Sequence, residues 1–107
     1  MQNKFYLEEG DRMLTGKNRS YLRGEANNLN PVVHVGKDGI TEAVIEQLDA
    51  ALEDHELLKA RILESTGRTT RSAAEELATA TGADVVQVIG GIAVLFRQRE
   101  EDSNFKL

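Results

Sequence analysis

Residues 32–41 read Val-Val-His-Val-Gly-Lys-Asp-Gly-Ile-Thr, and they run a short β-branched segment directly into a Gly-x-x-Gly turn and a helix start. The valines favour extended structure, and Pro31 fits the first position of a strand, where its missing N–H donor costs little. Gly36 should end this strand. Thr41 is a good N-cap for the amphipathic run of residues 42–55. The stretch therefore predicts a strand, a turn and a helix in immediate succession.

The predicted turn has the chemistry of an anion-binding site. Gly36 and Gly39 give the backbone conformational freedom and leave no Cβ in the way of a partner. Unpaired N–H groups and the positive end of the helix dipole lie beside the turn, and Lys37 stands at its tip. Together these groups can hold a phosphate. Asp38 opposes such binding, because its carboxylate repels an anion.

Gly-x-x-Gly is a short pattern, and many such turns only join a strand to a helix. Two other phosphate-binding motifs are excluded, because the sequence has neither the Gly-Lys-Ser/Thr of a Walker loop nor a third glycine at the dinucleotide-binding spacing. What remains resembles the Gly-x-x-Gly loop with which KH-type proteins clamp the RNA backbone.

Four segments carry a resemblance to a known family: Leu14–Lys17, Val35–Thr41, Ala51–Lys59 and Val86–Gly90. In this order they resemble the bacterial YhbY proteins, which are stand-alone CRM domains (chloroplast RNA splicing and ribosome maturation). The resemblance implies an RNA-binding domain that associates with precursors of the large ribosomal subunit. It also implies a fold similar to the C-terminal domain of translation initiation factor three, with a basic first helix near the glycine loop.

The composition limits the class of protein. The 107 residues suffice for one domain with a single core, and no apolar run approaches the roughly 20 residues of a membrane span. The absence of cysteine excludes disulfides and thiolate metal sites. We find no nucleophile-base pair and no metal-ligand cluster in the sequence, so we predict neither an enzyme nor a cofactor. We expect a cytoplasmic monomer.

The formal net charge of −5 is unusual for a nucleic-acid-binding domain, but the charges are segregated along the chain. Bases outnumber acids in residues 13–39 and 57–74, whereas residues 40–56 contain acids only. A basic face can therefore exist on an acidic protein. The predicted RNA-binding residues are Lys17, Arg19, Arg23, Gly36, Lys37, Asp38, Gly39 and Thr41. The expected partner is structured RNA, namely ribosomal RNA in large-subunit precursors.

Periodicity and capping residues predict the other elements. A first helix is expected over residues 16–28, capped by Thr15, with Leu22, Ala26 and Leu29 buried. The remaining elements are a strand over residues 56–64, a helix that starts at Thr69, Thr70 or Ser72 and stops at Gly82, and a hairpin of strands 84–89 and 92–97 around Gly90-Gly91.

This order of elements indicates a two-layer α/β domain, α-β-α-β-α-β-β, with a four-stranded mixed sheet. In the strand over residues 56–64, apolar residues alternate with Lys59 and Arg61, so one face is apolar and the other can be basic. Residues 13–98 should form the domain, between a flexible leader at 1–12 and a charged tail at 99–107 that is expected to fray.

An acidic row on the second helix supports a different function. Glu42, Glu46, Asp49 and Glu53 follow the three-four spacing of one exposed helix face. Such a face could dock on a basic ribosomal protein, in which case the chain would be a protein-interaction module. Binding to naked RNA distinguishes the two functions.

Overall fold

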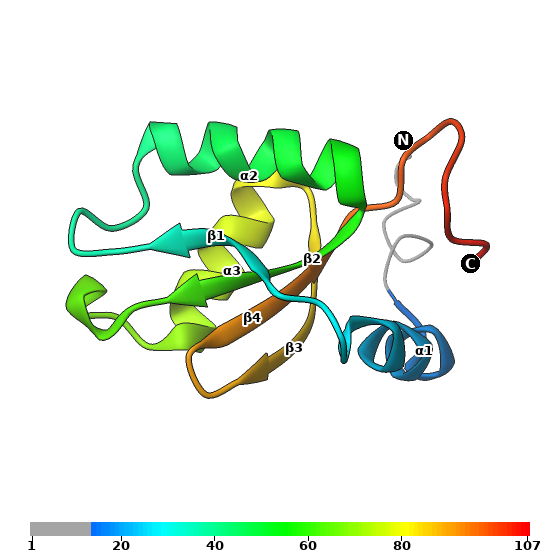
Figure 1. Ribbon diagram of the computed structural model, residues 1–107, viewed down its shortest axis with the longest axis horizontal. Coiled ribbons are helices and arrows are strands. Elements are labelled where there is room, and N and C mark those ends of the chain that lie inside the picture. Colours follow the sequence, from blue (N-terminus) through cyan, green and yellow to red (C-terminus); the bar gives the residue numbers. More distant parts are fainter. Residues whose placement is uncertain (1–13) are drawn as a thin grey trace.

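The computed structural model describes residues 14–107. Their elements follow in the order α1 (Gly16–Ala26), β1 (Pro31–Val35), α2 (Glu42–His55), β2 (Leu57–Ile62), a short 3-10 turn η2 (Glu64–Thr66), α3 (Thr70–Thr81), β3 (Asp84–Ile89) and β4 (Ile92–Phe96). The strands form a four-stranded sheet in the order β1-β2-β4-β3 (Figure 1). The predicted α/β domain with a mixed sheet is confirmed.

The sheet is mixed because it has one parallel pair of strands and two antiparallel pairs. β1 and β2 are parallel, with Val33 beside Ala60 and Val35 beside Ile62, and α2 connects them. β4 pairs antiparallel with both β2 and β3. It therefore lies between these two strands, and the crossover through α3 joins strands that do not touch.

Helices α2 and α3 cover one face of the sheet. Alternate strand residues point toward them, as expected for a half-buried strand. The buried cluster on this face is Val33, Val35, Leu48, Leu52, Leu58, Ala60, Ile62, Ala73, Ala74, Leu77, Ala78, Ala93 and Leu95. This cluster is the main core, and it fixes the end of β1 against the start of α2.

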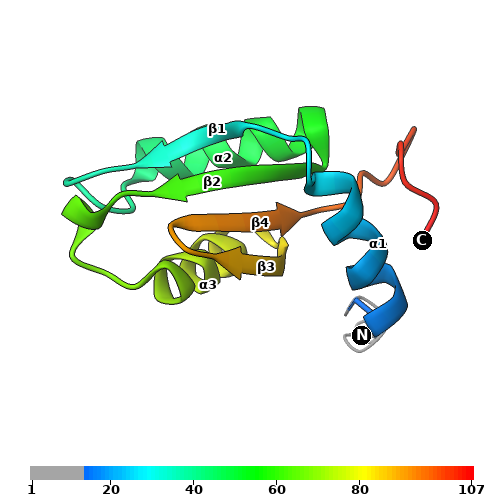
Figure 2. The same cartoon turned by 60° about the horizontal axis from the view of Figure 1, so that its bottom comes forward.

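Helix α1 packs on the opposite face of the sheet. A second buried cluster joins Leu22 and Ala26 of α1 to Leu57, Val86, Val94 and Phe96. Because Leu57 and Phe96 are paired at one end of the sheet, α1 covers this end, and no other helix of residues 14–107 lies over the rest of the face (Figure 2).

Helix ends follow the predicted capping chemistry. The side chains of Thr15, Thr41 and Thr69 each accept a hydrogen bond from a backbone N–H of the first turn, and Gly82 ends α3 with a φ of 75°. One detail was wrong. Because α1 stops at Ala26, Leu29 lies outside the helical period and is 37% exposed rather than buried.

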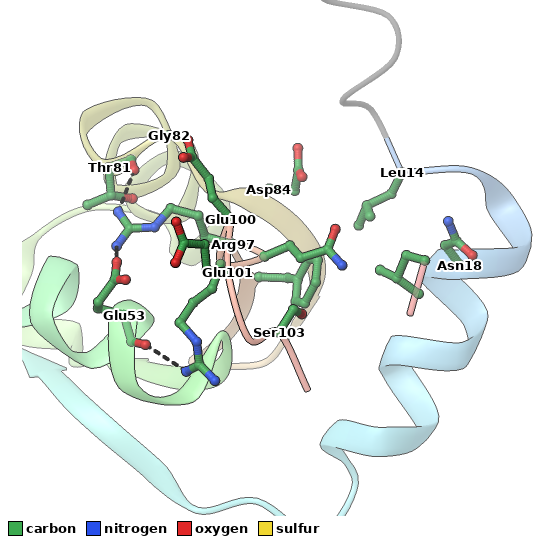
Figure 3. Close-up of a pocket in the computed structure, with 14 residues that line it drawn as sticks. Leu14, Asn18, Glu53, Thr81, Gly82, Asp84, Arg97, Glu100, Glu101 and Ser103 are labelled. Atoms are coloured by element: carbon green, nitrogen blue, oxygen red, sulfur yellow. Dashed lines mark hydrogen bonds and ion pairs between the residues drawn. The ribbon is translucent and has the colours of Figure 1, made fainter. Parts of the chain in front are cut away.

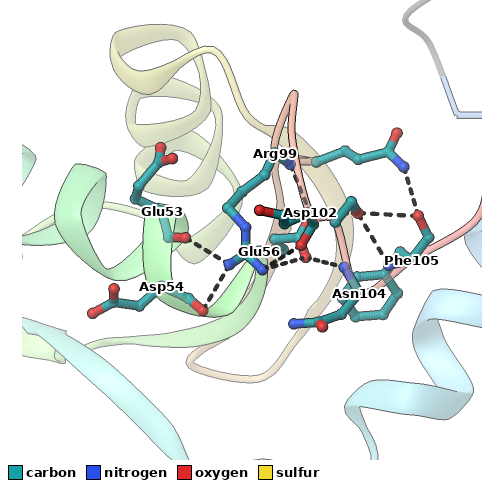
Figure 4. A network of polar contacts seen from close by, with 9 residues as sticks. Glu53, Asp54, Glu56, Arg99, Asp102, Asn104 and Phe105 are labelled. Atoms are coloured by element: carbon teal, nitrogen blue, oxygen red, sulfur yellow. Dashed lines mark hydrogen bonds and ion pairs between the residues drawn. The ribbon is translucent and has the colours of Figure 1, made fainter.

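Glu56 was predicted to begin the second strand, but it lies just before β2. It caps α2 with a φ of 64°, and its side chain is completely buried. The carboxylate accepts hydrogen bonds from the backbone N–H of Arg99 at 2.7 Å, from that of Asn104 at 2.8 Å and from Ser103 Oγ at 2.6 Å (Figure 4). Burial by itself raises the pKa of Glu56, but these three hydrogen bonds and the Arg99 guanidinium together lower it below its usual value.

The charged tail is therefore attached to the domain, and the expectation that it frays was wrong. The Arg99 side chain also donates to the carbonyls of Glu53 and Asp54, which are among the last of α2. Phe105 packs edge-on against Phe96, with ring centroids 5.3 Å apart. The sequence pattern could not predict this, because the hydrogen bonds of Arg99 and Asn104 join the tail to a segment more than forty residues earlier.

The predicted flexible leader at residues 1–12 lies outside the described residues. Over residues 14–107, no helix has the length and apolar character needed to cross a bilayer.

Candidate functional site

The glycine turn of residues 36–39 connects the end of β1 to the approach of α2. The Gly39 N–H donates to the Gly36 carbonyl at 2.9 Å, so this amide is used by the turn itself. Gly39 has a φ of 75°, a conformation in which a Cβ is strained. Gly36 has an ordinary φ, and a Cβ there would meet only Leu63 Cδ1, at 3.8 Å. Only one of the two glycines is thus required by backbone conformation.

Several donors beside the turn remain unpaired. Lys37 and Asp38 are exposed, and within residues 14–107 neither their side chains nor their N–H groups form a hydrogen bond or ion pair. The hydroxyl oxygen of Thr41 caps the Val44 N–H at 3.2 Å. The N–H groups of Glu42 and Ala43, in the first turn of α2, have no helical partner. The Glu42 and Ala43 amides lie at the end of α2 where the helix dipole is positive.

The turn and the start of α2 nevertheless carry more negative than positive side-chain charge. Lys37 contributes one positive charge, Asp38 contributes one negative charge, and Glu42 adds a second carboxylate at the start of α2. An anion bound here would need further bases nearby to outweigh the two acids.

The predicted bases of α1 are not near the turn. α1 packs at the Leu57 end of β2, whereas the turn follows Val35, whose carbonyl accepts from Leu63 just beyond the other end of β2. The two lie at opposite ends of the sheet in both views (Figures 1 and 2), separated by a strand length of about 16 Å. The expectation that the first helix lies near the glycine loop was wrong.

The three bases of α1 also differ from one another. The Arg19 guanidinium donates to the carbonyls of Val85 and Val86 and so holds α1 against β3. Lys17 is exposed and Arg23 half-buried, and within the described chain neither side chain has a hydrogen bond or ion pair. Arg19 therefore has a structural role, whereas the charges of Lys17 and Arg23 are unpaired within residues 14–107.

Two bases, Lys59 and Arg61, lie on the sheet between the turn and α1. We define the open face as the strand residues that lie on the α1 side of the sheet but outside the α1 cluster: Val32, His34, Lys59, Arg61, Gln87 and Ile89. His34 lies beside Arg61 in the β1–β2 register, and Arg61 lies beside Ile92. The predicted site residues omitted Lys59 and Arg61, although their alternation with apolar residues indicated a basic strand face. What the sequence could not predict is that this face stays uncovered.

Part of the acidic row of α2 forms ion pairs with Arg97. Arg97 Nη1 donates to Asp49 Oδ1 at 2.6 Å and to the Thr81 carbonyl at 2.8 Å, and Arg97 Nη2 donates to Glu53 Oε1 at 3.2 Å. Two of the four carboxylates therefore help to fix the start of the tail. Glu42 and Glu46 are exposed and have no such bond within residues 14–107.

A hollow of about 1190 Å³ lies beside this cluster, away from the glycine turn (Figure 3). Residues of the tail line part of it, and Asn18 of α1 and Glu53 of α2 line it from other sides. Arg97 and Arg99, which line it, are already paired with protein groups, so neither guanidinium is free to bind a ligand there. The described residues also contain no group of His, Asp and Glu side chains that could hold a metal ion.

Comparison with known proteins identifies a family and several relatives of similar sequence. The model of the CRS1 / YhbY (CRM) domain family matches residues 14–97. The "Probable RNA-binding protein YqeI" of Bacillus subtilis is 36% identical over 95 residues, which cover 89% of this chain and 99% of that protein. An "RNA-binding protein" of Haemophilus influenzae is 39% identical over 88 residues, covering 82% of this chain and 89% of that one.

A solved structure agrees with the fold. The solution structure of SAV1595 from Staphylococcus aureus is similar with a TM-score of 0.75 and 39% identity, and the similarity covers 89% of this chain and 99% of that chain.

Proposed function

Because this chain belongs to the CRS1/YhbY (CRM) domain family, we propose that it binds RNA and assists assembly of the large ribosomal subunit in the cytoplasm. The relatives named as RNA-binding proteins support RNA as the ligand. One observation carries the proposal to particular residues. The turn of residues 36–39 presents an unpaired lysine and unpaired amides beside the N-terminus of α2.

The turn would hold the sugar-phosphate backbone rather than the bases. A phosphate oxygen could accept from the amides of Lys37, Asp38, Glu42 and Ala43, while the Lys37 ammonium compensates its charge. Gly36 leaves this space open, Gly39 gives the turn its shape, and Thr41 fixes the first turn of the helix. Phosphate contacts do not read sequence, so recognition would depend on the shape of the RNA.

Lys17 and Arg23 of α1 would form a second contact at the other end of the sheet. Their free charges favour this role, and Tyr21, on the same helix, is about half exposed rather than buried in the core. Arg19 would act indirectly, because its guanidinium holds the helix in place. Contacts at both ends predict a binding site as long as the sheet, which suits structured RNA better than a mononucleotide.

Naked RNA provides the direct test of this function. The purified chain should bind fragments of large-subunit ribosomal RNA without any ribosomal protein. In a cell extract fractionated on a sucrose gradient, it should sediment with large-subunit precursors and leave them at high salt. If it binds isolated basic ribosomal proteins but no ribosomal RNA at low salt, the chain is a protein-interaction module instead.

A further inference from the structure

We propose that the open face of the sheet continues the RNA site of the glycine turn, with Arg61 and Lys59 as its main phosphate contacts. This inference rests on the proposed function, because it concerns the path of the same RNA. It adds a row of basic residues, Arg61 and Lys59, that leads from the turn toward α1. We call this row the track.

The geometry of the sheet makes the turn and the open face continuous. His34 lies two residues before Gly36 on β1, and its side chain is on the face opposite to α2 and α3. Arg61 is its neighbour on β2, and Lys59 is two residues further from the turn, about 6.6 Å along the strand. These side chains thus form a row that starts beside the turn and runs toward the end covered by α1.

The charge of the open face suits an anion. The strands contain a single acidic residue, Asp84, and it is paired with Phe96 at the end that α1 covers. Within the described chain, the side chains of Lys59 and Arg61 form no ion pair or hydrogen bond. The planar donors of an unpaired Arg61 can bind a phosphate through two hydrogen bonds.

Lys59 and Arg61 also supply positive charge that the turn itself lacks. Lys37 alone cannot outweigh Asp38 and Glu42, and the bases of α1 are a strand length away. Arg61 and Lys59 are the bases that lie between. A strand of RNA that passes from the turn over the sheet would meet them before it reached Lys17 or Arg23.

The chemistry of the face favours the backbone of RNA over its bases. The exposed apolar side chains are aliphatic, with Val32 41% and Ile89 57% exposed, and no aromatic residue belongs to the open face. Stacking on aromatic rings is the usual way in which a sheet binds unpaired bases. Binding here should therefore depend strongly on salt and little on base sequence.

A set of variants that remove one or two positive charges tests this track. Arg61→Gln and the double variant Lys59→Gln with Arg61→Gln remove charge from the open face, and Lys37→Gln removes it from the turn. Arg71→Gln is the matched control, because Arg71 is 62% exposed on α3, which covers the other face. Binding of large-subunit ribosomal RNA fragments is measured at several salt concentrations, with a thermal melt for each variant.

If the track exists, Arg61→Gln should weaken binding about fivefold to eightfold at about 0.1 M salt, as expected for one phosphate contact. The double variant should flatten the slope of log affinity against log salt by about 1.4 to 1.8. Arg71→Gln should change affinity less than about twofold, since it removes the same charge without a contact. Arg61 is exposed, so its variant should fold even if the double variant does not.

The outcomes separate this inference from the proposed function. If Lys37→Gln weakens binding while Arg61→Gln and the control behave alike, the turn binds RNA and the track is refuted. If the unaltered chain binds no ribosomal RNA, the proposed function fails as well. Equal losses in Arg61→Gln and Arg71→Gln would mean that net charge alone matters, which also refutes the track.

Discussion

The backbone N–H of Arg99 donates a hydrogen bond of 2.7 Å to the fully buried carboxylate of Glu56, which lies 43 residues earlier in the chain. Together with the bonds from Ser103 and Asn104, it closes the tail over the end of α2. A buried carboxylate needs such partners, because an unpaired charge in the interior is costly. The domain thus depends on residues beyond its last strand.

Glu56→Gln should destabilise the fold by about 1–3 kcal/mol, since the amide cannot accept all of these hydrogen bonds and its NH₂ would face donors. Chemical denaturation at neutral pH measures this loss. Gln98→Ala is the comparison variant, because Gln98 makes an exposed hydrogen bond to Phe105 in the same tail. Equal stability of Glu56→Gln and the unaltered chain would contradict a structural role for the carboxylate.

The same carboxylate should make stability depend on acid. The pKa of Glu56 is lowered in the folded chain, so its contribution is complete above the unfolded value of 4.5 and is lost as the pH falls through the lower folded value. Below pH 4.5 the unaltered chain should therefore lose stability more steeply than Glu56→Gln. Denaturation curves of the two proteins at matched pH values compare these slopes, and parallel slopes would contradict the account.

The two glycines of the turn should respond differently to alanine. Gly39→Ala should cost about 1–2 kcal/mol, because Gly39 has a positive φ. Gly36→Ala should be close to neutral in stability, since its Cβ would find ordinary contact distance. If phosphate approaches the backbone here, Gly36→Ala should still weaken RNA binding, as measured by titration. A stable Gly36→Ala variant with unchanged affinity would show that no close approach occurs at this glycine.

Lys37→Glu should weaken RNA binding and leave the melting temperature nearly unchanged, because the exposed side chain has no partner within the described residues. Loss of one contact alone corresponds to about a fivefold to eightfold effect at about 0.1 M salt, and the new carboxylate adds repulsion. Arg71→Glu, which makes the same change of charge on α3, is the control. Identical affinities for the two variants would remove the turn from the site.

Arg19→Gln should show whether Arg19 stabilises the fold or contacts RNA. Its guanidinium donates to two carbonyls of β3, so the variant should lose about 1–2 kcal/mol of stability. Lys17→Gln should leave stability unchanged and weaken RNA binding. The reverse pattern, a stable Arg19→Gln that binds poorly and a normal Lys17→Gln, would assign the RNA contact to Arg19.

Capping residues and the alternation of side chains were enough to predict α1, α2 and the two faces of β2. Thr41 and Thr15 cap the helices that the sequence suggested, and the alternation at Lys59 and Arg61 correctly divided β2 into two faces. The position of α1 was not predictable in this way. It depends on Leu22 and Ala26 meeting Leu57 and Phe96, and this packing decides which part of the sheet remains open.

The prediction that the tail frays was wrong for a related reason. Its charged residues are typical of a solvated end, and only the fold reveals that Arg97 and Arg99 meet the acids and carbonyls of α2. Sequence patterns describe neighbours along one element. The contacts that determine which charges are paired join elements far apart in the chain, which is why the proposed site includes Lys59 and Arg61 although the sequence prediction omitted them.

The salt dependence of RNA binding tests the central claim most directly. Affinity of the unaltered chain for large-subunit ribosomal RNA fragments is measured from low to high salt, with heparin as a second polyanion for comparison. About three to five phosphate contacts predict a slope of log affinity against log salt of order −2 to −4. A slope near zero, or binding to heparin as tight as to RNA, would contradict a dedicated RNA site built from the turn and the basic residues beside it.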